Sequence, residues 1–156
     1  MKPLAELFIS LGCENVRTYI QSGNVVFQTD HDSMPDLAKR LSDKVLQDYG
    51  FEPKVLLLDA TELASAITNS PFPTEDGKLL HFFFLETNPE APALEKLDAV
   101  KQQSEKYQLN ENVFYLYAPD GVSRSKLFAK IEKCLDVPAT ARNWNTVNKL
   151  SSMVDG

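Results

Sequence analysis

The chain has 156 residues, a net charge of −6 and 43% apolar residues, and it contains nine phenylalanines. This length is typical of one medium domain or of two small packed halves. The apolar content excludes a disordered chain, because it is enough to bury a core. The negative charge argues against a whole-surface attraction to nucleic acid or to an anionic membrane.

The sequence shows no targeting, membrane or metal-binding pattern. Its apolar runs all fall short of the roughly 20 residues that cross a bilayer. Its first residues include Lys2 and Glu6 and do not resemble a secretory signal. The spacing of Cys13 and Cys134 indicates neither a disulfide framework nor a metal knuckle. We therefore expect a cytoplasmic protein with no membrane segment, no metal and no cofactor.

The first sixty residues are predicted to run helix, strand, strand, helix, strand. Apolar residues at helical spacing predict a helix over residues 3–11, which Gly12 ends. Alternating residues on either side of a Ser-Gly-Asn turn predict a β-hairpin over residues 15–29. A helix over residues 35–49 and a short apolar strand over residues 53–59 follow.

The remainder of the chain alternates helices and strands in a similar way. A turn is predicted at residues 75–78, and Pro138 is predicted to end a helix. This alternation of helices with antiparallel-compatible strands predicts an α+β fold, with two smaller sheets or one shared sheet. We place helices at 61–67, 90–106, 123–135 and 146–154, and strands at 78–86 and 112–118.

Charge is unevenly distributed along the chain. Residues 121–150 hold six basic and two acidic residues, which gives +4, and the rest of the chain carries −10. A basic segment on an acidic protein is a candidate anion site. The alternative is a solvated helix face that is rich in lysine.

The stretch GVSRSKL, residues 121–127, follows a predicted strand and begins a predicted helix. It lacks the second glycine of a phosphate-binding P-loop, and Ser125 precedes the lysine, so we reject that motif. Helix capping explains the serines but not the cations, because Arg124 and Lys126 oppose the helix dipole in a first turn. A bound anion would offset that cost. We therefore propose Arg124, Ser125 and Lys126 as ligand-binding residues.

The stretch RNWNT gathers a guanidinium, two carboxamides and an indole. Arg142 suits a phosphate or carboxylate, and Trp144 offers a flat face for stacking. The alternative is a structural corner, in which Asn145 or Thr146 caps the final helix and Trp144 lies in the core. Capping does not explain Arg142 together with both asparagines. We add Arg142, Asn143, Trp144 and Asn145 to the candidate ligand-binding residues.

A third polar group, TYIQSGN, lies at the turn of the predicted hairpin. Asn24 suits the turn itself. Tyr19 and Gln21 share one face of the strand and are not needed for a hairpin. We include Tyr19, Gln21 and Asn24 among the candidates, with a purely structural turn as the alternative.

Catalytic residues are not evident from the sequence. His31 and His81 both lack a second histidine or a carboxylate at metal-ligand spacing. Tyr19, Asp120 and His81 are the candidates for a general base, and the sequence does not place them near the cations. Whether the protein is an enzyme therefore stays open at this point.

In their order and spacing, NVRTYIQSGNVVF, GVSRSKL and ATARNWNTVNKL resemble a bacterial family known as domain of unknown function 1697. The resemblance covers nearly the whole chain. It implies two ferredoxin-like α/β plaits, which we place at residues 1–60 and 61–156. It implies no established activity, substrate or cofactor.

The start of the chain departs from that family's pattern. Members carry an opening strand and a loop of the type LLRGINVGG before the first helix, whereas this chain begins at MKPLAELF. We expect the first half to lack its opening strand, which would leave strand edges unpaired. The alternatives are a strand from another chain or an adjusted pairing.

Three functions are compatible with these patterns. The first is binding of a small phosphorylated or anionic ligand, including a nucleotide or single-stranded nucleic acid. The second is a structural or interaction module whose motifs staple the two halves. The third is a hydrolase or transferase with an anion clamp. A homodimer is compatible with all three.

Overall fold

The computed structural model describes residues 2–19, 24–30, 34–51, 55–72, 75–123 and 125–155, which form helices and antiparallel strands. This confirms the α+β class. The chain forms two compact units. Unit 1 comprises Met1–Ala60 with Leu150–Gly156, and unit 2 comprises Thr61–Lys149.

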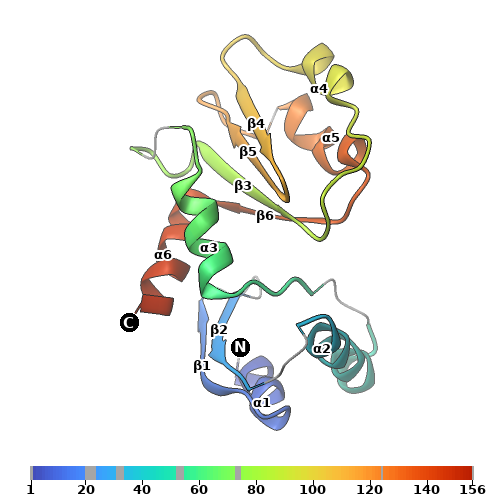
Figure 1. Ribbon diagram of the computed structural model, residues 1–156, viewed down its shortest axis with the longest axis vertical. Helices are drawn as coiled ribbons and strands as arrows, with labels where there is room; N and C mark the ends of the chain where they lie inside the picture. The colour runs from blue at the N-terminus through green and yellow to red at the C-terminus, as the bar shows by residue number, and fades with distance from the viewer. Residues whose placement is uncertain are drawn as a thin grey trace. The chain divides into compact units, whose positions relative to one another are not determined.

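Unit 2 contains a complete α/β plait (Figure 1). Its four strands lie in the order β4-β5-β3-β6, and every neighbouring pair is antiparallel. The chain order βαββαβ with this strand order is that of a ferredoxin-like fold. The elements are β3 (Leu80–Leu85), α4 (Leu94–Val100), β4 (Lys106–Asn110), β5 (Val113–Tyr117), α5 (Lys126–Leu135) and β6 (Ala139–Asn143).

The sheet of unit 2 is buried on both faces. Phe83 and Leu85 pack with helix α5 on one face. Phe82 lies on the other face, where its ring contacts those of Tyr115 and Trp144. The Tyr115 hydroxyl donates to the Ala66 carbonyl of α3 (Ala60–Thr68) over 2.6 Å, so α3 lies over this second face. Burial of both faces explains why β3 reads as a continuous apolar run.

Unit 1 is built on a two-stranded antiparallel sheet of β1 (Glu14–Tyr19) and β2 (Asn24–Gln28). Its helices are α1 (Lys2–Ser10) and α2 (Met34–Tyr49) (Figure 1). The hairpin and both helices lie where the sequence predicts them. The core consists of Leu7, Phe8, Cys13, Leu37, Leu41 and Val45.

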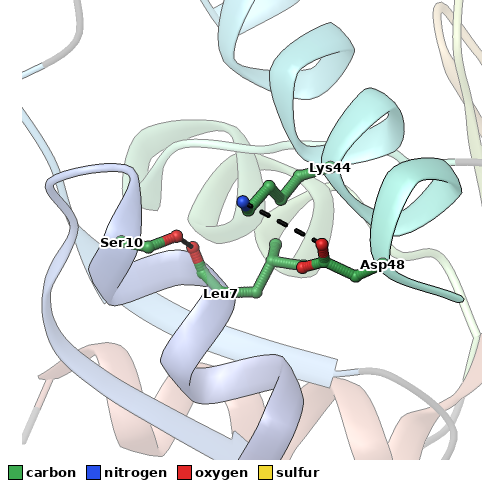
Figure 2. A network of polar contacts seen from close by, with 4 residues as sticks. All are labelled: Leu7, Ser10, Lys44 and Asp48. Carbon is green, nitrogen blue, oxygen red and sulfur yellow. Dashed lines mark hydrogen bonds and ion pairs between the residues drawn. The ribbon is translucent and has the colours of Figure 1, made fainter.

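The polar contacts of α1 and α2 drawn in Figure 2 each join residues within one helix. The Ser10 hydroxyl donates to the Leu7 carbonyl over 2.6 Å and satisfies an acceptor in the last turn of α1. Lys44 and Asp48 form an ion pair of 4.0 Å along α2. Both of its side chains are more than a third exposed, so the pair adds little stability. Unit 1 is therefore held together mainly by its apolar core.

The prediction of a strand over residues 53–59 is wrong for residues 55–59, the part of this range that the structure describes. Residues 55–59 form no strand. Val55 and Leu57 pack against the core of unit 1, so their apolar character is satisfied by burial alone. A strand also needs a hydrogen-bonded neighbour, and β1 and β2 pair only with each other among the described residues.

The helix predicted over residues 90–106 is present as α4 but is shorter than predicted, over Leu94–Val100. Helix α4 ends at Val100, because Lys101 takes an extended conformation with ψ 131°. The chain then forms β4, in which Tyr107 and Leu109 pack on the core and the backbone pairs with β5. Glu111 makes the tight turn between these strands at φ 54°. Pairing with β5 thus overrides the local helical signal.

Strand β6 was not predicted. Residues 139–143 carry small and polar side chains, all of them half-buried. They form a strand because β3 offers a backbone edge from His81 to Leu85. Helix α6 (Trp144–Asp155) follows at once, two residues before its predicted start. Its residues up to Lys149 belong to unit 2, and those from Leu150 belong to unit 1.

Candidate functional site

Two of the three polar motifs lie at one edge of the unit 2 sheet, where strands begin and end. Because neighbouring strands are antiparallel, β5 and β6 end where β3 begins. The cross-strand partners at this edge are Leu80 with Tyr117 and His81 with Asn143. Helices α5 and α6 both start beyond it. We call this the α5–α6 edge.

Ser125 caps helix α5. Its Oγ accepts a hydrogen bond from the Phe128 backbone N–H over 3.0 Å and donates to Glu105 Oε2 over 2.5 Å. Glu105 is 1% exposed, and its Oε1 accepts from the Gln102 backbone N–H over 2.8 Å. The candidate ligand residue Ser125 thus already makes two hydrogen bonds within unit 2. A carboxylate of the chain itself lies beside the start of α5.

Lys126 is the first residue of α5, and its side chain is exposed. The first turn of this helix holds no acidic residue. Within the described residues, the backbone N–H groups of Lys126 and Leu127 have no hydrogen-bond partner. Arg124, which was predicted beside them, lies outside the described residues. The start of α5 is therefore a positive helix end with a cation.

At the start of α6, two first-turn backbone N–H groups already donate to acceptors of the protein. The Thr146 backbone N–H donates to Asn143 Oδ1 over 3.0 Å, and the Trp144 N–H donates to the Gly77 carbonyl over 3.1 Å. Asn143 is therefore the capping side chain, and the expectation that Asn145 or Thr146 caps this helix is wrong. Asn143 takes this role because it is the last residue of β6, where the backbone is still extended.

Gly77 has a role that the sequence did not reveal. A Cβ built on it would lie 2.1 Å from Asn145 Oδ1 and 3.0 Å from the Asn145 backbone nitrogen. The turn before β3 therefore packs directly on the first turn of α6, and a side chain at position 77 would have to displace that of Asn145. The sequence marked Gly77 as a turn residue; its contact with α6 depends on residues that lie far apart in the chain.

Arg142 and Trp144 lie together on the sheet face away from α5. Arg142 is the cross-strand partner of Phe82, and the Trp144 ring stacks on Phe82 with centroids 5.9 Å apart. Arg142 Nη1 donates to the Ala141 carbonyl over 2.8 Å. The guanidinium is half-buried, and this burial lowers the pKa of Arg142.

The sheet separates Arg142 from the start of α5. Phe128 of α5 contacts the rings of His81 and Phe83, which lie on the opposite face from Phe82. The two described cations of the predicted anion site, Lys126 and Arg142, are therefore not brought together on one face. Arg142 is grouped with Trp144, and Lys126 with Ser125 and Glu105.

His81 is buried beneath the first turn of α5. It is 9% exposed, its ring meets that of Phe128 edge-on at 5.5 Å, and its Nδ1 has no hydrogen-bond partner among the described residues. Burial lowers the pKa of His81. Asp120, a second candidate base, accepts a hydrogen bond from the Ser104 hydroxyl over 2.5 Å.

The third motif lies in unit 1. Tyr19 and Asn24 are cross-strand partners, and Asn24 Nδ2 donates to the Tyr19 carbonyl over 3.1 Å. This bond closes the hairpin, so Asn24 has a structural role there. Gln21 lies outside the described residues. No group of three or more His, Cys, Asp or Glu suited to a metal ion occurs in the part of the chain that the structure describes.

The protein is of the α+β class, and its unit 2 contains a ferredoxin-like plait. The chain belongs to the family described as "Protein of unknown function (DUF1697)", whose model matches residues 1–115. The matched part contains the hairpin motif. The GVSRSKL and ATARNWNTVNKL stretches lie beyond it.

A solved structure supports the same fold. The conserved bacterial protein SP0830 from Streptococcus pneumoniae is similar over 100% of this chain and 89% of its own length, with a TM-score of 0.68 and 24% sequence identity. No curated protein sequence matches the chain. Across the described residues, helices long and apolar enough to cross a membrane do not occur.

Proposed function

We propose that unit 2 binds a small anionic ligand of the phosphate type at the start of α5. The observation that carries this proposal is the contrast between the two helices of the α5–α6 edge. A capping side chain binds the third N–H in both helices, that of Phe128 in α5 and that of Thr146 in α6. The N–H of Trp144, the first residue of α6, also donates to the Gly77 carbonyl. The N–H groups of Lys126 and Leu127 in α5 have no partner among the described residues. Backbone N–H groups at a helix start bind phosphate and carboxylate groups.

The side chains support the same proposal. Lys126 lies in a helix turn where its charge opposes the dipole, and an anion would offset that repulsion. Ser125 keeps the first turn in a defined geometry through its bond to the Phe128 N–H. The carboxylate of Glu105 is a like charge next to the ligand position, so we expect weak binding of a compact anion.

A small ligand is favoured over single-stranded nucleic acid. Proteins that bind single strands present exposed aromatic rings on which the bases stack. In unit 2, Phe82 and Tyr115 are both 0% exposed, and Trp144 has one ring face against Phe82. This aromatic face is therefore occupied by the protein itself.

The test is a titration of the whole chain with inorganic phosphate and with a nucleoside monophosphate, followed by calorimetry. We expect Lys126→Ala to weaken phosphate binding about three- to tenfold, through loss of one charge-assisted contact. Lys130→Ala is the matched control, because Lys130 is an exposed lysine one turn later in α5. Equal losses in both variants, or no phosphate binding at all, would overturn the proposal.

A structural module is the second candidate. It is favoured by the contacts at the start of α6. There Asn143, Trp144 and Gly77 join the turn before β3, strand β6 and helix α6. In this case the RNWNT stretch contributes to stability alone. Arg142→Ala would then lower the free energy of unfolding and leave phosphate binding at the start of α5 unchanged.

A further inference from the structure

The imidazole of His81 makes no hydrogen bond to the described residues, although the residue is only 9% exposed. Its Nδ1 is enclosed by protein atoms and has no partner among them, whereas Nε2 is not enclosed in this way. A buried polar group without a partner is costly, and a phenylalanine would fill similar space without that cost. A histidine at this position therefore points to a partner from outside the chain.

His81 lies on the sheet face that carries α5, at the α5–α6 edge. It is the second residue of β3, and its ring meets that of Phe128 edge-on at 5.5 Å. Phe128 is the third residue of α5, and its N–H is bound by the Ser125 cap. On the sheet side the ring has the buried neighbours Phe83 and Leu116. The nitrogen that is not enclosed therefore faces outward, where α5 starts.

The burial of Nδ1 decides which nitrogen of His81 carries the proton. Neutral imidazole has one N–H donor and one bare acceptor nitrogen. A buried N–H without an acceptor loses its hydrogen bond to water, so the proton belongs on Nε2. Burial also lowers the pKa of His81 below its ordinary value of 6.5, so the ring is neutral above that pH. His81 thus presents a neutral Nε2–H donor on its open side.

The charged side chains at this end of the sheet come from three elements. Helix α5 contributes Lys126, the loop before β4 contributes the buried carboxylate of Glu105, and the loop after β5 contributes Asp120. The cross-strand partners of His81 on β5 and β6 are an uncharged leucine and an uncharged asparagine. Positive charge therefore does not exceed negative charge among these described residues, and N–H donors are needed to hold an anion here.

We propose that the Nε2–H of His81 donates a hydrogen bond to the anion that binds at the start of α5. This inference rests on the proposed function and adds a contact from the sheet to it. The backbone N–H groups of Lys126 and Leu127 bind the anion from the helix, and the neutral imidazole binds it from β3. Donors that approach from two elements suit an oxyanion with several accepting oxygens, such as phosphate or a phosphate monoester.

Two amide substitutions separate the two nitrogens of the ring. The amide nitrogen of glutamine reaches the position of Nε2, and that of asparagine only the position of Nδ1. The whole chain is titrated with inorganic phosphate at about pH 8, where free imidazole is neutral. We expect His81→Phe and His81→Asn to weaken phosphate binding about three- to tenfold, and His81→Gln to retain most of it. His31→Gln, at the other histidine of the chain, is the matched control and should have no effect.

Nitrogen NMR of the imidazole rings gives a readout that a merely structural role of His81 does not move. The unbound chain should show the proton of His81 on Nε2. Phosphate should then shift the Nε2 signal more than the Nδ1 signal, because only Nε2 meets the anion. The chain has two histidines, so His81→Phe assigns the signals.

The outcomes distinguish this contact from the proposed function. Phosphate binding that Lys126→Ala weakens but His81→Phe leaves unchanged would contradict the His81 contact alone. A chain that binds no phosphate would overturn both proposals. If the His81 variants fail to fold, NMR of the unchanged chain decides, and an Nε2 signal that bound phosphate does not move excludes the contact.

Discussion

Asn143 Oδ1 accepts a hydrogen bond from the Thr146 backbone N–H over 3.0 Å. The last residue of β6 is thereby the cap of α6, and the chain passes from strand to helix without a loop. Loss of a capping side chain costs roughly 0.5–2 kcal/mol. We expect Asn143→Ala to lower the free energy of unfolding by about 1 kcal/mol in chemical denaturation, and Asn143→Asp to retain most of it. Asn148→Ala, at an exposed position later in α6, is the control.

A side chain at Gly77 is expected to destabilise the contact between the turn before β3 and helix α6. A methyl group there would overlap Asn145 Oδ1 at 2.1 Å and press on the Asn145 backbone nitrogen at 3.0 Å. Gly77→Ala should therefore cost about 1–3 kcal/mol of unfolding free energy. Asn145→Ala in the same chain should recover part of this loss, because it removes the side-chain clash but not the backbone contact. Additive losses in the double variant would contradict the contact.

The buried imidazole of His81 is expected to make stability depend on pH. Burial lowers its pKa below the ordinary value of 6.5, so the unfolded chain binds a proton first as pH falls. This contribution is complete above pH 6.5 and is lost below it, with a slope of at most about 1.4 kcal/mol per pH unit. Denaturation at stepped pH values between neutrality and the carboxylate range measures it. His81→Phe should flatten the curve in that window; an unchanged slope would exclude His81 as its origin.

The carboxylate of Glu105 should reduce anion binding at the start of α5. Glu105→Gln keeps the shape of the side chain that meets Ser125 and removes its charge. We expect phosphate affinity to rise about three- to tenfold, because a like charge is gone. The unfolding free energy should fall by about 1–2 kcal/mol, since a charge-assisted hydrogen bond becomes neutral. Glu90→Gln, at an exposed position in unit 2, should change neither quantity.

The sequence predicted elements well where local signals and tertiary contacts agree. Strand β3 is a continuous apolar run, and the apolar stripe of α2 places Leu37, Leu41 and Val45 in the core. The prediction failed where a segment depends on a distant partner. Strand β4 exists because β5 is beside it, and β6 exists because β3 offers an edge. Residues 55–59 have strand-like composition but no neighbouring strand in the described part of unit 1.

In the candidate site, too, the sequence indicated local features but not the contacts between distant residues. The sequence offered helix capping by a serine and a structural corner at RNWNT only as alternatives to ligand binding, and the hydrogen bonds of Ser125 and Asn143 are of this local kind. It did not reveal that Glu105 meets Ser125 or that Gly77 meets Asn145, since these partners are 20 and 68 residues apart. It also grouped Lys126 with Arg142, which the sheet separates onto opposite faces.

The sequence by itself determined the α+β class, the resemblance to the family and the positions of the polar motifs, because these follow from local periodicity and residue type. Only the tertiary structure decided which motif residues already have partners. Hydrogen bonding and burial between distant segments assign Asn143 to a cap, Gly77 to a close approach and Glu105 to a buried carboxylate.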